Sequence, residues 1–78
     1  MCKIMTLYVG SQCHLCDQAK DIIKRAIENT NWTCSEVNIE NNELLLEKYG
    51  LRIPVVVSDN GEEKGWPFTL NQVRRLIR

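Results

Sequence analysis

The apolar residues of the first half of this sequence follow patterns that predict a strand, a helix and a second strand. A nearly continuous apolar run from Ile4 to Val9 predicts a strand that is buried on both faces. The next apolar residues recur at helical spacing and predict an amphipathic helix, with Asp17 in its first turn: Ala19, Ile22, Ile23, Ala26 and Ile27. Residues 29–31, Asn-Thr-Asn, should end that helix. The second strand is expected from Trp32 to Ile39, with Val37 and Ile39 on one face and Trp32 and Cys34 on the other.

The pattern in the second half predicts a short helix followed by a hairpin. Asn41 is the expected cap of the helix, and Gly50 is expected in left-handed geometry just past its end. The helix should carry its apolar side chains at Leu44, Leu45, Leu46 and Tyr49. The hairpin should pair a strand at residues 55–57, Val-Val-Val, with a returning strand at residues 62–66, through the turn Asp-Asn-Gly at residues 59–61.

The last segment predicts a helix that completes a single domain over residues 1–78. Thr69 and Gln72 have the spacing of a capping box, and Phe68 with Val73 can form a hydrophobic staple. The buried stripe of this helix should consist of Leu70, Val73, Leu76 and Ile77. The order of elements is therefore β-α-β-α-β-β-α, which is an α/β fold without linker or repeat.

Composition and charge narrow the range of partners and the compartment. Ten basic residues balance ten acidic ones, which argues against a nucleic-acid or anionic membrane partner. The basic cluster Arg74, Arg75 and Arg78 is expected to interact with the last helix's dipole. The apolar run after Lys3 is too short for a signal peptide or a membrane span, so we expect a cytoplasmic protein. In a reducing compartment, the four cysteines are expected to be catalytic or metal-binding.

The motif Cys13-His14-Leu15-Cys16 lies between the first strand and the start of the amphipathic helix. The free N–H groups and dipole of a helix N-terminus stabilise a thiolate, so Cys13 is the expected nucleophile. Cys16 lies within reach and should resolve the mixed disulfide that Cys13 forms with a substrate. His14 either adds positive charge that tunes the thiolate or is an exposed loop histidine with little effect.

Three other interpretations of the motif remain open. A C-x-x-C supplies two ligands for metal chemistry with zinc, copper or an iron-sulfur cluster, and a closed zinc site would need Cys2 and Cys34 as well. Copper chaperones of this length end in a strand, whereas this chain ends in a helical stripe. The pair is alternatively structural, or belongs to a binding module without turnover. Cys34 on a strand is typical of a small buried hydrophobe, and Cys2 is expected at an exposed terminus.

A resemblance to a known family adds to these predictions. A C-x-x-C after the first strand, followed by Ile53-Pro54 before the valine strand, is similar to the pattern of thioredoxins and glutaredoxins. The segments 49–55, Tyr-Gly-Leu-Arg-Ile-Pro-Val, and 66–68, Trp-Pro-Phe, resemble a small family of bacterial-type glutaredoxin-like proteins. The resemblance implies a thioredoxin-like, mixed four-stranded sheet with helices on both faces. It also implies a cis Pro54 beside the cysteine pair, with the backbone of Ile53 positioned to pair with an extended substrate.

By this resemblance and by the placement of its cysteines, the chain is expected to be a thiol-disulfide oxidoreductase. Its partners would be protein or low-molecular-weight disulfides, with a reductase or glutathione as electron donor and no tightly bound cofactor. Two departures argue against glutathione binding. His14 and Leu15 replace the usual Pro-Tyr, and residues 65–69, Gly-Trp-Pro-Phe-Thr, replace a Gly-Gly before an acidic helix start. The N–H groups at Thr69 still suit a carboxylate, but the bulky Trp66 and Phe68 are expected to crowd it. The Trp-Pro-Phe segment is either a substrate platform or hydrophobic cover for the small core.

Overall fold

The protein, described by a computed structural model over residues 3–11 and 13–77, contains a mixed four-stranded sheet. The elements along the chain are β1 (Lys3–Val9), α1 (His14–Ile27), β2 (Trp32–Asn38), α2 (Glu43–Tyr49), β3 (Val55–Val57), β4 (Glu63–Gly65) and α3 (Leu70–Leu76). This order confirms the predicted β-α-β-α-β-β-α sequence. In space the strands follow the order β2-β1-β3-β4, with β1 parallel to β2 and antiparallel to β3, and β4 antiparallel to β3.

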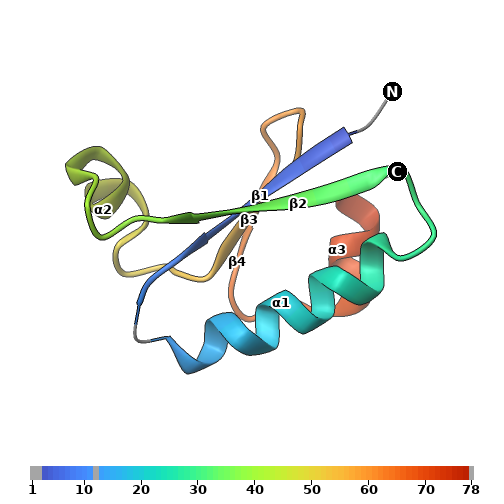
Figure 1. Cartoon of the computed structure of the whole chain (residues 1–78), viewed down its shortest axis with the longest axis horizontal. Coiled ribbons are helices and arrows are strands. Elements are labelled where there is room, and N and C mark those ends of the chain that lie inside the picture. Colours follow the sequence, from blue (N-terminus) through green and yellow to red (C-terminus); the bar gives the residue numbers. More distant parts are fainter. Residues whose placement is uncertain (1–2, 12, 78) are drawn as a thin grey trace.

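Helices cover both faces of the sheet, as the resemblance implied. Helices α1 and α3 lie together on one face, and α2 lies beyond the other near the ends of β1 and β2 (Figure 1). The larger core forms under α1 and α3, where Leu7 and Val56 of the sheet pack with Ile23 and Val73. The smaller core forms under α2. The sheet is therefore the middle layer of three.

The two faces of β1 differ in burial, which corrects the prediction of a strand buried on both. Met5, Leu7 and Val9 point toward α1 and α3 and are at most 7% exposed. On the opposite face Tyr8 stacks on Tyr49 with ring centroids 4.5 Å apart, but Ile4 is 55% exposed. The reason is that α2 is only seven residues long and lies at the other end of β1 from Ile4 (Figure 1).

Both predicted ends of the short helix α2 need correction. Asn42, not Asn41, is its N-cap, because the Asn42 side chain accepts a hydrogen bond from the Leu45 N–H at 3.1 Å. Gly50 has right-handed geometry, with φ −52° and ψ −34°, and its N–H continues the helix by donating to the Leu46 carbonyl. A side chain at Gly50 would collide with that carbonyl oxygen. Glycine is thus required here by close backbone approach rather than by a left-handed conformation.

The hairpin and the last helix form largely as predicted. Gly61 adopts a φ of +88° in the turn, and β4 is one residue shorter at each end than expected. At one end of β4, the Glu62 N–H donates a hydrogen bond to the Asn60 side chain in the turn instead of to β3. At the other end, Pro67 has no N–H with which to extend the strand pairing. The capping box is confirmed: Thr69 and Gln72 exchange hydrogen bonds of 2.9 and 3.2 Å.

The C-terminal helix is tied to the rest of the fold by its apolar stripe and by one indole. Val73 is fully buried, and Leu70, Leu76 and Ile77 pack around the larger core. The Trp32 indole donates a hydrogen bond of 3.2 Å to the Ile77 carbonyl. Arg74 and Arg75 lie in the last turn, whereas Arg78 is outside the described residues. Among the helices in the described ranges, none has the length and apolarity needed to cross a bilayer.

The unequal burial of β1 gives a direct test of the fold. We expect Leu7→Ala to lower the free energy of unfolding by about 2–5 kcal/mol, because it leaves a cavity at a fully buried position. Ile4→Ala on the same strand should cost less than about 1 kcal/mol, since Ile4 is mostly in solvent. Urea unfolding monitored by circular dichroism measures both. Equal losses would contradict the assignment of the two faces.

Candidate functional site

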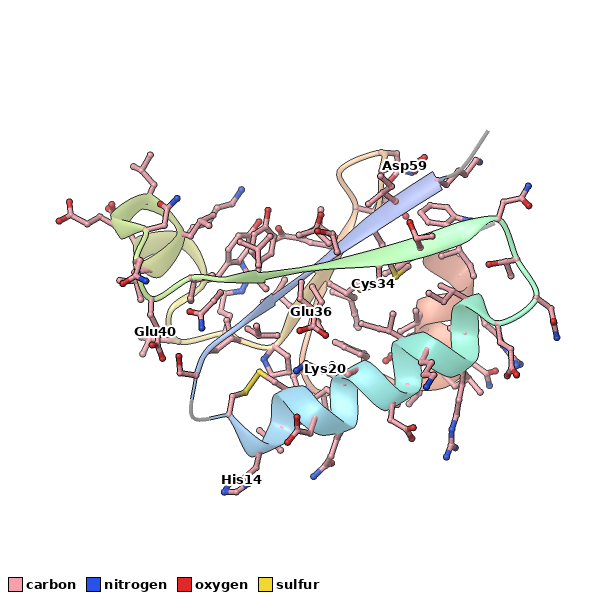
Figure 2. All side chains as sticks on the ribbon, viewed as in Figure 1. His14, Lys20, Cys34, Glu36, Glu40 and Asp59 are labelled. Carbon is pink, nitrogen blue, oxygen red and sulfur yellow. A yellow bond between two sulfur atoms is a disulfide. The ribbon has the colours of Figure 1, made fainter. Side chains whose placement is uncertain are left out.

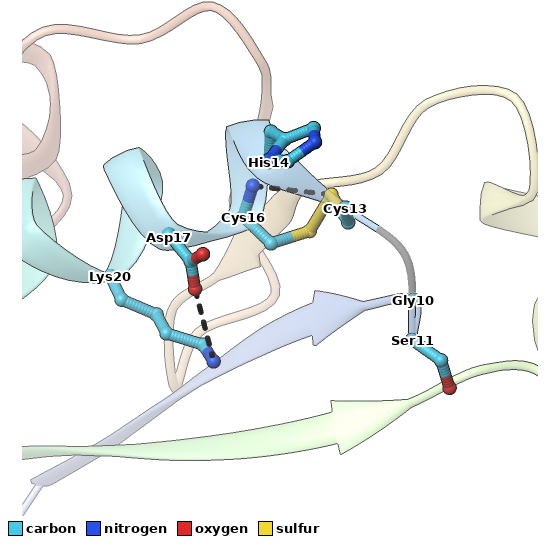
Figure 3. Close-up of a pocket in the computed structure, with 7 residues that line it drawn as sticks. All are labelled: Gly10, Ser11, Cys13, His14, Cys16, Asp17 and Lys20. Atoms are coloured by element: carbon cyan, nitrogen blue, oxygen red, sulfur yellow. Dashed lines mark hydrogen bonds and ion pairs between the residues drawn. A yellow bond between two sulfur atoms is a disulfide. The ribbon is translucent and has the colours of Figure 1, made fainter.

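Cys13 caps the N-terminus of α1, directly after the loop that leaves β1. Its backbone is extended, with φ −135° and ψ 96°, and its Sγ accepts a hydrogen bond of 3.1 Å from the Cys16 N–H (Figure 3). In most helices an Asp, Ser or Asn oxygen takes this position. A donor aimed at sulfur and the positive end of the α1 dipole both stabilise negative charge there. The geometry therefore favours a thiolate at Cys13 in the reduced protein.

The structure joins Cys13 and Cys16 in a disulfide, with their Cα atoms 5.2 Å apart. The two sulfurs differ in exposure: Cys13 is half-buried, whereas Cys16 is 2% exposed. A partner can therefore reach Cys13 more easily than Cys16. This difference in exposure is compatible with Cys13 as nucleophile and Cys16 as resolving cysteine. Both roles stay predictions.

A pocket of about 580 Å³ opens beside the disulfide, lined by Gly10, Ser11, Cys13, His14, Cys16, Asp17 and Lys20 (Figure 3). Lys20 makes ion pairs with Asp17 at 3.9 Å and with Glu36 of β2 at 3.3 Å. His14 is exposed at the start of α1, pointing away from the sheet (Figure 2). Its proposed effect on the thiolate stays a prediction. The pocket thus combines a disulfide with charges of both signs.

The loop before Cys13 is held by a carboxylate that is distant in the sequence. Glu40 accepts two hydrogen bonds from Ser11, one from its N–H at 2.8 Å and one from its hydroxyl at 2.7 Å. Asn38 donates to the same hydroxyl at 3.0 Å. The bonds from the Ser11 N–H and hydroxyl lower the pKa of Glu40 below its ordinary value of 4.5. The end of β2 thereby anchors the segment that leads into Cys13.

Ile53 and Pro54 lie next to the start of this loop. The Ile53–Pro54 peptide bond is cis and Pro54 is buried. A Cβ added to Gly10 would lie 2.8 Å from the Ile53 Cδ1, so the two segments are in close contact. The Ile53 N–H donates to the Tyr49 carbonyl at 3.1 Å, and the Pro54 carbonyl accepts from the Trp66 N–H at 3.0 Å. Backbone pairing of Ile53 with a substrate strand stays a prediction. Because the Ile53 N–H is already used, the hydrogen bond to such a strand would be accepted mainly by the Ile53 carbonyl.

The segment between α2 and Pro54 is fastened to β4 by a polar cluster. Glu63 accepts hydrogen bonds from the Arg52 guanidinium at 2.9 Å and from the Tyr49 hydroxyl at 3.1 Å. The Arg52 hydrogen bond is the main reason that the pKa of Glu63 lies below its ordinary value. The Arg52 and Lys48 cations also lie over the Tyr49 ring. These contacts hold the residues before Ile53 against the sheet.

Comparison with known proteins identifies the family. The chain matches the family described as Glutaredoxin-like domain (DUF836) over residues 4–78. It belongs to this family. A Northeast Structural Genomics target protein from X. campestris has a similar X-ray structure, with 36% sequence identity and a TM-score of 0.82 over 94% of this chain and 93% of that one. A comparison with curated proteins finds no match.

Two more distant structures share the fold. Protein Ne2328 from Nitrosomonas europaea is 21% identical, with a TM-score of 0.76 over 87% of this chain and 82% of its own. A mutant thioredoxin from Halobacterium salinarum is 20% identical, with a TM-score of 0.72 over 96% of this chain and 71% of its own. The glutaredoxin-like protein therefore has the predicted thioredoxin-like fold.

Cys34 lies away from the Cys13–Cys16 pair. It is aligned with Met5 of β1, whereas Cys13 follows the opposite end of that strand (Figure 2). Burial, and next the charge of Glu36, raise the pKa of the half-buried Cys34 thiol. Cys2 is outside the described residues. Within the described ranges, no group of three or more His, Cys, Asp or Glu side chains is placed to hold a metal ion.

The segment before α3 covers the core of the glutaredoxin-like protein. Phe68 is 3% exposed and the half-buried Trp66 packs edge to face against it, with centroids 5.1 Å apart. These positions match the second of the two predicted roles for this segment, cover for the core.

Sequence reasoning missed two parts of the site. The Ser11–Glu40 contact spans 29 residues along the chain, and no local pattern indicates it. Lys20 did have a signal: it follows Cys16 by one helical turn, so the two share a face of α1. The spacing places Lys20 on the face of α1 that carries Cys16, and the structure adds that both residues line one pocket.

The Ser11–Glu40 pair should make stability depend on pH in one direction. The folded pKa of Glu40 is lowered, so its contribution is complete above pH 4.5 and is lost as the pH falls through the lower folded value. Glu40→Gln should therefore lower the melting temperature near pH 7. Between about pH 5 and pH 3, the melting temperature of this variant should fall by less than that of the wild type. Melting curves across that range measure both. Parallel curves would contradict the anchoring role.

Proposed function

We propose that this glutaredoxin-like protein is a thiol-disulfide oxidoreductase with Cys13 as nucleophile and Cys16 as resolving cysteine. The observation that carries the proposal is the position of Cys13 at the N-cap of α1, with its sulfur hydrogen-bonded to the Cys16 N–H. This location favours the thiolate, which is the attacking species in disulfide exchange. The difference in exposure of the two cysteines supports their separate roles.

The reaction has two exchange steps. The Cys13 thiolate attacks a substrate disulfide, forms a mixed disulfide and releases one substrate thiolate, which takes a proton from solvent. Cys16 then loses its proton, attacks the Cys13 sulfur and releases the second substrate thiolate, which is also protonated. Two electrons and two protons pass from the cysteine pair to the substrate. A reductase or glutathione would return the pair to the dithiol.

Protein disulfides fit the surroundings of Cys13 at least as well as small ones. Leu15, between the two cysteines in the sequence, is 44% exposed. An exposed apolar side chain next to a reactive sulfur suits contact with a polypeptide. The cover of Trp66 and Phe68 before α3 replaces the small residues that the resemblance associates with glutathione binding.

Cysteine variants test the proposal. Cys13→Ser should lower disulfide reduction by at least about 100-fold, because it removes the attacking thiolate. Cys16→Ser should accumulate a mixed disulfide, whose mass equals that of the variant plus the part of the substrate still bound to Cys13, less two hydrogen atoms. Cys34→Ser is the matched control and should keep wild-type rates, since Cys34 lies outside the pocket. The assay is reduction of a disulfide-bonded peptide, read by mass. Retained turnover in Cys13→Ser would rule out the mechanism.

The redox equilibrium of the pair distinguishes the possible donors. Thiol alkylation and mass after equilibration in defined buffers give the reduction potential of Cys13 and Cys16. A value near about −270 mV indicates a thioredoxin-like reductant, and one near about −200 to −230 mV a glutaredoxin-like role. If no Cys13–Cys16 disulfide forms at any poise, the redox function fails and metal binding by the thiol pair becomes the better hypothesis.

A further inference from the structure

Lys20 lies on the same face of α1 as Cys16 and lines the same pocket. The two residues are four positions apart, which places them one turn from each other along the helix. Figure 3 shows the Lys20 ammonium paired with the Asp17 carboxylate, and both residues line the same pocket as the cysteine pair. The pocket therefore places a cationic side chain near the buried sulfur.

The second exchange step makes an electrostatic demand on this pocket. Cys16 must become a thiolate before it can attack the mixed disulfide. It is 2% exposed, and burial disfavours a charged sulfur. Moreover, the hydrogen bond at the start of α1 is made to Cys13 and not to Cys16. A nearby positive charge would offset the cost of ionising Cys16.

Two carboxylates from different elements hold the Lys20 ammonium in place. Glu36 of β2 lies 3.3 Å away and Asp17 of α1 lies 3.9 Å away. The Lys20 side chain is 41% exposed, so its charge is only partly screened by water. Without Lys20, the carboxylates of Asp17 in the pocket and of Glu36 on β2 would lose their shared cation, and their negative charges would oppose a thiolate.

We propose that Lys20 is a positioning residue for the resolving step: its ammonium, held by Glu36 and Asp17, stabilises the thiolate of Cys16. The inference rests on the proposed function and assigns a residue to its second step. Lys20 takes no part in the bond changes. The proton of Cys16 passes to solvent, and the electron pair on its sulfur then forms the bond to Cys13. The bond between Cys13 and the substrate sulfur breaks in the same step, and the substrate leaves as a thiolate that takes a proton from solvent.

Other charged groups lie in the same region and also affect the ionisation of Cys16. The experiment must therefore distinguish their effect from that of Lys20. The charged or titratable neighbours are Cys13, His14 and Asp17 around the start of α1, Glu36 on β2, Glu40 at the loop and Lys24 in the adjoining groove. Of these, Lys24 makes the best control. It is exposed on the same helix, one turn farther from Cys16, and does not line the pocket at the disulfide.

A purely structural role for Lys20 makes a different prediction. The Lys20–Glu36 pair joins α1 to β2, so losing it would lower stability without changing the ionisation of Cys16. A test must therefore measure the thiolate itself. In the Cys13→Ser background Cys16 has no intramolecular disulfide partner in the pocket, and the ultraviolet absorbance of its thiolate can be followed against pH. Alkylation with peptide mapping assigns the signal to Cys16.

Three substitutions in that background decide the matter. Lys20→Met should move the Cys16 titration midpoint to higher pH and lower its thiolate fraction near neutral pH by roughly three- to tenfold, as expected on losing an opposite charge. Lys20→Arg should restore most of the effect, because it keeps the charge. Lys24→Met should leave the midpoint unchanged. Circular dichroism confirms that each variant is folded.

The outcomes separate this inference from the function on which it rests. If Lys20→Met titrates like its parent, or if Lys20→Arg shifts the midpoint as far as Lys20→Met does, the role of Lys20 is overturned even where the wild type exchanges disulfides. If the wild type shows no exchange, the proposed function fails, and the titration still reports whether Lys20 acts on Cys16.

Discussion

The packing of β1 against α1 is the interaction on which the rest of the structure depends. Met5, Leu7 and Val9 on one face of β1 meet Ala19 and Ile23 of α1 within the larger core. Burial of these side chains is the main favourable term in so small a domain. It also fixes where the chain leaves the sheet and where α1 begins. The cysteine motif lies at that junction, so the core determines where the Cys13–Cys16 pair is held.

The chemistry of the site follows from two different electrostatic environments a few residues apart. Cys13 is half-buried at a helix N-terminus and has a backbone donor for its sulfur. Cys16 is buried inside the first turn, where the protein supplies no such donor to its sulfur among the described contacts. Asp17 and Lys20 line the pocket beside the cysteine pair, and Lys20 is also paired with Glu36 of β2. The two sulfurs of one disulfide therefore differ in burial and in backbone hydrogen bonding.

Long-range polar contacts hold two segments of the chain, the loop at Ser11 and the segment that ends at Pro54. Glu40, after β2, anchors the loop at Ser11, and Glu63 of β4 anchors the segment that ends at Pro54. Both carboxylates are largely exposed, so each ion pair or hydrogen bond adds little stability. Their effect is geometric: they restrict two loops that meet where Gly10 contacts Ile53. The site is thus built on rigid strand ends with a polar anchor on each loop.

The sequence by itself determined the features that depend on neighbours along the chain. The stripe of α1, the Thr69–Gln72 capping box and the placement of Cys13 before a helix all follow from local spacing, and the structure confirms each of them. Tertiary structure decided the rest. Glycine is needed at position 50 because the Leu46 carbonyl lies so close, and Ile4 is exposed because α2 is too short to cover it. The Ser11–Glu40 and Lys20–Glu36 contacts depend on the pairing of β1 with β2. Such contacts join residues that lie close together only after the sheet has formed, and no local pattern encodes that proximity.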